Sequence, residues 1–206
     1  MGSMFYYAIL LVAYALGSIP TAVLFSRINH GVDIRTLGDG NMGARNTKRL
    51  FGFYGGFIVA VIDIIKGALA VLLASSFKLP FEWQLLTGIA VILGHDFPAF
   101  AQFQGGQGFA TTTGIFLVLF PLQTMIGAVI YFFLYLFFHN SDLAASVGMG
   151  LLALLVYLSQ SPLLAVGFII LTLLFIPFKQ WLDKPRRERI RDEQLVETVS
   201  IKNGEK

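Results

Sequence analysis

Runs of apolar residues fill most of this chain and are separated by short polar segments rich in glycine, asparagine and proline. A helix of ~20 apolar residues crosses the ~30 Å hydrocarbon layer of a bilayer. We expect seven such spans, at residues 5–27, 53–75, 84–103, 109–120, 122–138, 144–159 and 162–178. The fourth and fifth are short and meet around Pro121, so they could form one hairpin or a re-entrant pair, and six spans is the alternative. The pattern predicts an all-α polytopic membrane bundle.

The apolar pattern stops before the C-terminus. Residues 1–180 are expected to form a single transmembrane domain, and residues 181–206 a charged cytoplasmic tail. The tail has little apolar periodicity, so it could be a surface helix or disordered. Its basic half would lie well against anionic lipid headgroups, or it could serve only to set the topology.

Composition supports a membrane protein. The 206 residues are 56 % hydrophobic and 13 % charged, with a mean hydropathy of +0.73. Soluble domains have roughly one quarter of their residues charged, so a soluble globular or disordered chain is excluded. No Lys or Arg occurs from Leu79 to Phe178, as a lipid-embedded segment requires. The chain has no cysteine, which excludes disulfides and thiolate metal sites.

Basic residues set the expected orientation. They gather after the first span and in the tail, at Arg27, Arg35, Arg45, Lys48, Arg49, Lys179, Lys184, Arg186, Arg187, Arg189 and Arg191. The positive-inside rule therefore predicts an N-terminus outside, a C-terminus in the cytoplasm, and the loops 29–50, 104–108 and 139–143 on the cytoplasmic face. The sequence pI near 9.2 reflects this bias, and nucleic acid is not an expected partner.

Polar residues inside the apolar runs are candidates for a site. Ser18 lies in the segment Gly17–Pro20, where proline must kink the first span. Asp63 and Lys66 are three residues apart, share a helix face and can pair, either as a structural ion pair or as part of a site. His95 ends the third span beside Asp96, and we favour a site role over that of a packed hydrogen-bonding residue.

The first glycine-rich segment runs from Gly38 to Asn46. Its glycines let backbone N–H groups converge on an anion. Arg45 adds a two-point donor suited to phosphate, and Asn41 and Asn46 add neutral donors and acceptors. The candidate phosphate-binding glycines here are Gly38, Gly40 and Gly43.

The second glycine-rich segment runs from Phe103 to Gly114 and leads directly into an apolar helix. The free N–H groups at the start of that helix form an anion site, and the residues from Thr111 to Thr113 could add hydroxyls. The candidate residues are Gly105, Gly106, Gln107, Gly108 and Thr111. Two such segments on one face suggest phosphorylated ligands at the membrane surface, with an acyl chain held in the bundle.

The motifs resemble those of the bacterial acyl-phosphate:glycerol-3-phosphate acyltransferase family over about the first 115 residues. The matches are Gly17-Ser18-Ile19, Gly38 to Asn46, Asp63-x-x-Lys66-Gly67, Gly94-His95-x-x-Pro98 and Phe103-x-Gly105-Gly106-x-Gly108-x-Ala110-Thr111. The resemblance implies a bacterial plasma-membrane enzyme of phospholipid biosynthesis. Such an enzyme moves a fatty acyl group from acyl phosphate to glycerol 3-phosphate, without a metal or another cofactor, and we expect it to work as a monomer in the lipid bilayer.

The chain departs from the family pattern at several positions. Gln104 and Gln107 stand where the family usually has lysine, Asp39 where it has serine, and Arg45 where it has threonine. Loss of the lysines lowers the attraction for phosphate, and Arg45 could restore one charge. We assign His95, Asn41 and Arg45 as catalytic. The alternatives are a small transporter, a lipid-phosphate-binding protein, and a related acyltransferase with another acceptor or no activity.

Overall fold

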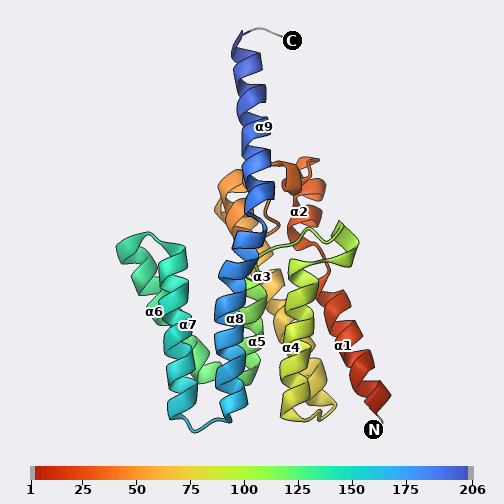
Figure 1. Ribbon diagram of the computed structural model, residues 1–206, viewed down its shortest axis with the longest axis vertical. Helices are drawn as coiled ribbons and strands as arrows, with labels where there is room; N and C mark the ends of the chain where they lie inside the picture. The colour runs from red at the N-terminus through yellow and green to blue at the C-terminus, as the bar shows by residue number, and fades with distance from the viewer. Residues whose placement is uncertain (1–2, 204–206) are drawn as a thin grey trace.

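The computed structural model describes residues 3–203, and within that range it contains helices and no β-strand (Figure 1). The all-α prediction is therefore confirmed. The α-helices are α1 (Ser3–Gly17), α2 (Thr21–His30), α3 (Ala44–Ser76), α4 (Phe81–Asp96), α5 (Phe109–Leu119), α6 (Pro121–Phe138), α7 (Ser141–Leu158), α8 (Leu163–Leu182) and α9 (Lys184–Asn203). Two short 3-10 helices, η1 (Ile34–Thr36) and η2 (Ala99–Ala101), lie in the connections.

Each predicted span contains at least one helix, although α4 ends at Asp96, before the predicted end at residue 103. In the described part of the chain, six segments are long and apolar enough to cross a membrane: Met4–His30, Ala44–Ser76, Phe81–Ala101, Pro121–Phe138, Ser141–Leu158 and Leu163–Leu182. Helix α5 has 11 residues, which at 1.5 Å per residue reach about 16 Å, roughly half of the hydrocarbon layer. α5 and α6 are separate helices that meet at Pro121, and seven full crossings stays a prediction.

Helices α1 and α2 are the two halves of the first predicted span. The helix is interrupted between Gly17 and Pro20, because proline has no backbone N–H to donate to the preceding turn. Gly17 also allows α1 to touch α4, since a Cβ there would lie 2.2 Å from the Val91 carbonyl oxygen. On the facing helix, a Cβ on Gly94 would lie 2.2 Å from the Tyr14 carbonyl oxygen. Glycine on both sides therefore sets this close contact.

Glycine also brings α3 against α5, which positions the site. A Cβ on Gly67 would lie 2.1 Å from the Thr111 carbonyl oxygen, and one on Gly114 would meet the Ile64 carbonyl oxygen. Small residues let membrane helices approach where packing, rather than the hydrophobic effect, holds them together. Next to this contact in the sequence of α5, Ile115 packs in a buried core with Val91 of α4 and Phe168 of α8.

The prediction that residues 29–50 form a loop is wrong for its last part, because α3 already begins at Ala44. The residues from Ala44 to Phe51 form two helical turns. Their side chains are mostly polar, so hydropathy alone does not distinguish this segment from a loop. Gly52 then breaks the helical geometry, with φ 81° and ψ −179°. A positive φ is accessible to glycine at little cost, so this kink re-aims the first turns of α3 relative to the membrane span.

The connections gather at two ends of the bundle (Figure 1). The α2–α3, α4–α5 and α6–α7 connections lie at the same end as α9, and the N-terminus lies at the opposite end. Helix α9 contacts the α2–α3 connection, where Gln194 Nε2 donates to the Thr36 carbonyl at 3.1 Å and the Ile190 side chain lies against Gly40. The first part of the charged tail is therefore docked on the first glycine-rich segment.

Candidate active site

A cavity of about 890 Å³ opens between α3, α5, α6, α7 and α8 at the glycine-rich end. Its mouth is polar and includes Asn41, Arg45, Gln107 and Asp142. Its deeper part is apolar, lined by Phe116, Leu152, Leu173 and Ile176. The volume lies within the roughly 300–1,000 Å³ of small-molecule sites. A ligand with a charged head and an apolar chain fits this division.

Two helix N-termini open on the mouth. Gly43 is the N-cap of α3 and Gly108 the N-cap of α5, and neither helix has a side chain that caps its first N–H groups. Gly43, Ala44, Gly108 and Phe109 all line the cavity. The first N–H groups of a helix lack partners inside the helix and carry its positive dipole end. The arrangement therefore favours an anion at two places in one cavity.

The first glycine-rich segment is held by Asn46. The buried Asn46 amide donates to the carbonyls of Leu37 and Asn41, each at 3.1 Å, and its Oδ1 accepts from Asp39 N at 3.3 Å. Gly38 and Gly40 have φ near +65°, which glycine adopts readily. Asn46, Gly38 and Gly40 do not line the cavity, so they shape the loop and leave Asn41 and Gly43 at the mouth.

The second glycine-rich segment lies directly on the end of α4. Gly106 N donates to the His95 carbonyl at 3.1 Å, and a Cβ on Gly106 would lie 2.2 Å from His95 Nε2. Gly105 is closer still to backbone, since its Cβ would meet the carbonyl oxygens of His95 and Asp96. Neither glycine lines the cavity, whereas Gln107 and Gly108 do. Gly105 and Gly106 thus allow the loop to pass close to His95.

Asp63 joins the broken first span to His95. Its Oδ1 lies 2.8 Å from Lys66 Nζ, accepts from Thr21 Oγ1 at 2.9 Å, and lies 3.7 Å from His95 Nδ1. Lys66 Nζ also donates to the Ile19 carbonyl at 3.3 Å, which satisfies a carbonyl at the break. The predicted Asp63–Lys66 ion pair is confirmed. Asp63 and His95 line the cavity, whereas Lys66 lies outside the lining and contacts Asp63.

Two more predicted residues lie outside the cavity lining. Ser18 is buried, and its Oγ accepts from Ala99 N at 3.4 Å, so it contacts the α4–α5 connection. Thr111 is buried, and its carbonyl lies against Gly67 at the α3–α5 contact. The neighbouring hydroxyls of Thr112 and Thr113 belong to residues that do line the cavity.

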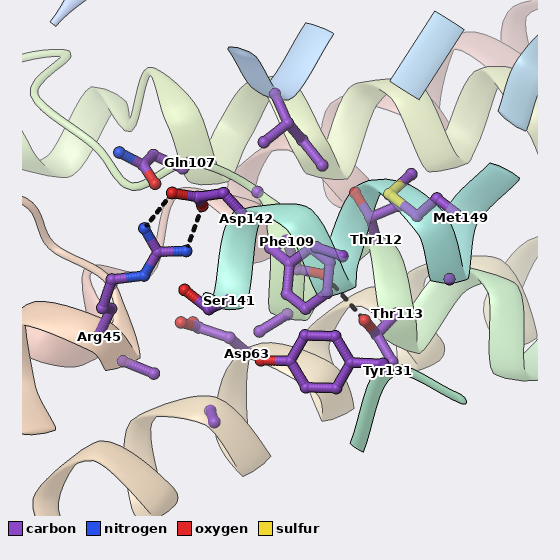
Figure 2. Close-up of a pocket in the computed structure, with 18 of the residues that line it drawn as sticks. Arg45, Asp63, Gln107, Phe109, Thr112, Thr113, Tyr131, Ser141, Asp142 and Met149 are labelled. Atoms are coloured by element: carbon purple, nitrogen blue, oxygen red, sulfur yellow. Dashed lines mark hydrogen bonds and ion pairs between the residues drawn. The ribbon is translucent and has the colours of Figure 1, made fainter. Parts of the chain in front are cut away.

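Arg45 faces Asp142 across the mouth (Figure 2). Arg45 Nη2 lies 2.6 Å from Asp142 Oδ1, and Nη1 lies 3.4 Å from Oδ2, so the pair has two points of contact. Asn140 sets the position of Asp142, because its Oδ1 caps α7 by accepting from the N–H groups of Asp142 and Leu143. Both charged side chains are about half exposed, and such pairs contribute little stability.

Arg35 joins the α2–α3 connection to the α4–α5 connection. It forms an ion pair with Asp33 at 2.7 Å and donates from Nη1 to the Ala101 carbonyl at 3.2 Å. The Arg35 hydrogen bonds hold the pKa of Asp33 well below its usual range, against the opposing effect of partial burial. Asp33 in turn raises the pKa of Arg35. The pair remains charged at neutral pH and braces the α2–α3 connection.

Several lining residues were not predicted as site residues. Those with polar side chains include Lys48, Arg49, Tyr131, Ser141, Asp142 and Gln180. Helical spacing would have indicated Lys48 and Arg49, three and four residues after Arg45, had this segment been assigned to a helix. Nothing in the local sequence indicated Gln180, because α8 reaches the mouth only through tertiary packing. Among the described side chains, no group of three His, Asp or Glu residues is placed to hold a metal ion.

Comparison with known proteins assigns the chain to a family. The family model described as glycerol-3-phosphate acyltransferase matches residues 7–187. The glycerol-3-phosphate acyltransferase of Bacillus cytotoxicus is 47 % identical over 126 residues, and the match covers 61 % of this chain and 63 % of that protein. The glycerol-3-phosphate acyltransferase of Geotalea daltonii is 36 % identical over 179 residues, covering 87 % and 89 % of the two chains.

A solved structure shares the fold. The crystal structure of PlsY (YgiH), an integral membrane glycerol 3-phosphate acyltransferase, in its glycerol 3-phosphate form matches with a TM-score of 0.80 and 28 % identity, over 90 % of this chain and 92 % of the other. Its lysophosphatidic acid form matches with a TM-score of 0.78. The chain is therefore an integral membrane protein, and it belongs to the glycerol-3-phosphate acyltransferase family.

Proposed function

We propose that this protein transfers a fatty acyl group from acyl phosphate to glycerol 3-phosphate, which forms lysophosphatidic acid and phosphate. The observation that carries this proposal is the cavity itself. One continuous space joins two uncapped helix N-termini and a cationic mouth to an apolar interior. The relatives and the structural neighbour, which are named for glycerol 3-phosphate acyl transfer, support the same substrate class.

The donor would place its chain in the deep, apolar part of the cavity. Phe116, Leu152 and Leu173 line that part, and burial of each methylene contributes about 0.8 kcal/mol. Its phosphate would then lie at the mouth beside the N-termini at Gly43 and Gly108. Negative charge builds up on this phosphate as it leaves, so fixed N–H dipoles stabilise the transition state more than the ground state.

The acceptor would bind at the same mouth. Arg45 is suited to hold the phosphate of glycerol 3-phosphate by two hydrogen bonds, once that phosphate displaces Asp142. Asn41 Oδ1 is buried and has no hydrogen-bond partner among the described residues, so it can accept from a glycerol hydroxyl. His95, held against Asp63, would help to orient the hydroxyl or the acyl carbonyl.

The reaction would begin when the acceptor hydroxyl oxygen attacks the acyl carbonyl carbon. A C–O ester bond forms, the C–O bond to phosphate breaks, and the departing phosphate takes both the electron pair and the hydroxyl proton. Phosphate is a good leaving group, so a strong protein base is not required. Binding both substrates in one cavity contributes the remaining rate enhancement through proximity.

We further propose that the enzyme works as a monomer in a bacterial plasma membrane, with residues 1–180 as the transmembrane domain and 181–206 as the tail. Most of the basic residues and both glycine-rich segments lie at one end of the bundle, with Lys78 in the α3–α4 connection at the other end, which supports a cytoplasmic active site under the positive-inside rule. Glycerol 3-phosphate would then reach the mouth from the cytoplasm, and the acyl chain would lie at membrane depth.

The test is phosphate release by purified protein in lipid nanodiscs, with palmitoyl phosphate and with or without glycerol 3-phosphate. We expect release that depends on the acceptor and that falls at least tenfold in Arg45→Ala and in His95→Ala. Folded protein that binds palmitoyl phosphate but releases none with glycerol 3-phosphate would contradict this acceptor. A panel of other alcohols would then separate a different acceptor from an inactive protein.

A further inference from the structure

Lys48 occupies a distinctive place at the cavity mouth. It is exposed and lies on the second turn of α3, and its Nζ is 6.0 Å from the ring centroids of both Phe53 and Tyr135. Lys48 and both rings line the cavity. The ammonium group therefore lies beside two aromatic side chains of the cavity lining.

All the permanent positive charge of the cavity comes from one short stretch of α3. Among the described lining residues, the lysines and arginines are Arg45, Lys48 and Arg49. The sequence explains this, because no Lys or Arg occurs from 79 to 178 and the second glycine-rich segment presents the neutral Gln107 instead. Any phosphate in the cavity must obtain its cationic partners from these two turns.

Lys48 differs from its two neighbours in having no counterion. Arg45 is paired with Asp142, and Arg49 Nη1 lies 3.9 Å from Asp39 Oδ2. In the part of the chain that the structure describes, no ion pair joins Lys48 to a carboxylate. Its charge is therefore available to a ligand without displacing a protein group. The two aromatic rings lie at the outer limit of the cation–π range, about 6 Å, so they leave the ammonium group open to an anion.

The fold holds this lysine in place. The kink at Gly52 turns the first two turns of α3 back toward the membrane span, so that a Cβ on Gly56 would lie 2.5 Å from Lys48 Cβ and 3.0 Å from Lys48 Cα. Gly56 also lines the cavity. The Lys48 backbone thus rests on the membrane span at the cavity wall, which fixes the origin of the side chain.

We infer that Lys48 binds the phosphate group of a substrate at the mouth of the cavity. The inference rests on the proposed acyl transfer and adds a binding residue to it. Two substrates carry the required chemistry, acyl phosphate and glycerol 3-phosphate. A lysine in the cavity lining beside these two aromatic rings suits either phosphate, so kinetics with each substrate decides which one Lys48 holds.

The experiment compares Lys48→Gln and Lys48→Arg with a matched control, Lys184→Gln, whose side chain is 64 % exposed on α9. Loss of a charged hydrogen bond to phosphate raises KM roughly tenfold. We expect this rise in Lys48→Gln for one of the two substrates, with kcat changed less than about twofold. Lys48→Arg should keep most of the affinity, and Lys184→Gln should match the wild type.

A binding measurement separates this inference from the proposed reaction. Calorimetry with a non-hydrolysable acyl phosphonate and with glycerol 3-phosphate reports affinity even if turnover fails. Weaker binding of either ligand to Lys48→Gln supports the inference, whether or not the wild type is active. Equal binding of both ligands to Lys48→Gln and wild type overturns it. An effect seen only in nanodiscs containing phosphatidylglycerol also overturns it, since Lys48 would then bind a lipid headgroup.

Discussion

Asp142 places a carboxylate at the point where the proposed site must attract phosphate. It holds Arg45 in an ion pair whose two side chains are 48 % and 58 % exposed. Exposed pairs contribute about 0–1 kcal/mol, so an incoming phosphate can displace the carboxylate at small cost. The same carboxylate repels phosphate until it is displaced. Asp142 therefore weakens substrate binding in our account, and its removal is expected to improve it.

The substitution Asp142→Asn tests this at the residue scale. We expect the KM for glycerol 3-phosphate to fall about two- to fivefold, which corresponds to removal of a competing pair worth up to 1 kcal/mol. Steady-state kinetics measures the change, with Asp192→Asn on α9 as the control. A higher KM in Asp142→Asn would show instead that the carboxylate positions Arg45 for binding.

Gly105 and Gly106 of the second loop are required by close contact rather than by backbone angle. A Cβ on Gly105 would lie 2.3 Å from the His95 carbonyl oxygen, whereas one on Gly150 in α7 would have no neighbour within 4 Å. Gly105→Ala is expected to lower the thermal unfolding midpoint by at least about 3 °C, because overpacking typically costs 1–3 kcal/mol. Gly150→Ala should leave the midpoint within about 2 °C of wild type or raise it.

Thermal unfolding in detergent, monitored by light scattering and tryptophan fluorescence, gives both midpoints. Equal midpoints for Gly105→Ala and wild type would mean that the loop is free to move away from His95. Activity should also be lower in Gly105→Ala than in Gly150→Ala, since a displaced loop would shift Gly108 and the N-terminus of α5.

The sequence was informative about residue types and less so about residue roles. The motif around Gly38–Asn46 indicated phosphate binding, and the structure places Asn41, Gly43 and Arg45 from it at the cavity. Asn46 belongs to the same motif, yet its amide is used to brace the loop. The sequence alone does not separate the role of Asn41 from that of Asn46. Both roles require a short polar side chain, and they differ only in whether that side chain points into the cavity or into the loop.

At the scale of elements, the cavity is built from helices of unequal length. Helix α5 is short, so its N-terminus can face the mouth while the paired helices α6 and α7 close the side of the space. Thr124 and Leu152 line the deep part, near the start of α6 and toward the end of α7. If the acyl chain extends to this depth, the residue at 124 limits its length.

Substitution of Thr124→Phe should therefore shift the preferred chain length. Displacing two methylenes costs about 1.6 kcal/mol, so the ratio of kcat/KM for palmitoyl over decanoyl phosphate should fall roughly tenfold. A folding defect lowers both values and leaves the ratio unchanged. Leu164→Phe, at an exposed position on α8, is the matched control. An unchanged ratio in Thr124→Phe, with both kcat/KM values close to those of the wild type, would place the chain elsewhere.

Hydropathy predicted the existence of every membrane helix but not the start of α3. The span predicted at 53–75 begins at Ala44, because polar residues that lie outside a membrane form a helix as readily as a loop. Gly52 separates the polar first turns of α3 from its membrane span. A single glycine in a sequence does not show whether the helix kinks or ends there. Lys48 and Arg49 lie in the helical turns before residue 53, which the predicted span did not include. These two cavity residues were therefore not predicted.

At the scale of the whole molecule, the account depends on which side of the membrane the mouth faces. The chain has no cysteine, so single cysteines can report accessibility without a background. We expect Gln104→Cys and Glu188→Cys to react with an impermeant maleimide only after intact bacterial cells are permeabilised. Ser76→Cys and Ser161→Cys should react in intact cells, because they lie at the opposite end of the bundle. The reverse pattern would place the active site outside.

The central claim is that one cavity holds the phosphate at its mouth and the acyl chain in its interior. The most direct test uses a non-hydrolysable acyl phosphonate with a photoreactive diazirine at the end of its chain, followed by peptide mapping of the labelled protein. We expect labelling of Phe116, Thr124 or Leu152 that palmitoyl phosphate competes away. Labelling confined to lipid-facing residues such as Leu11 and Leu163, without competition, would contradict it.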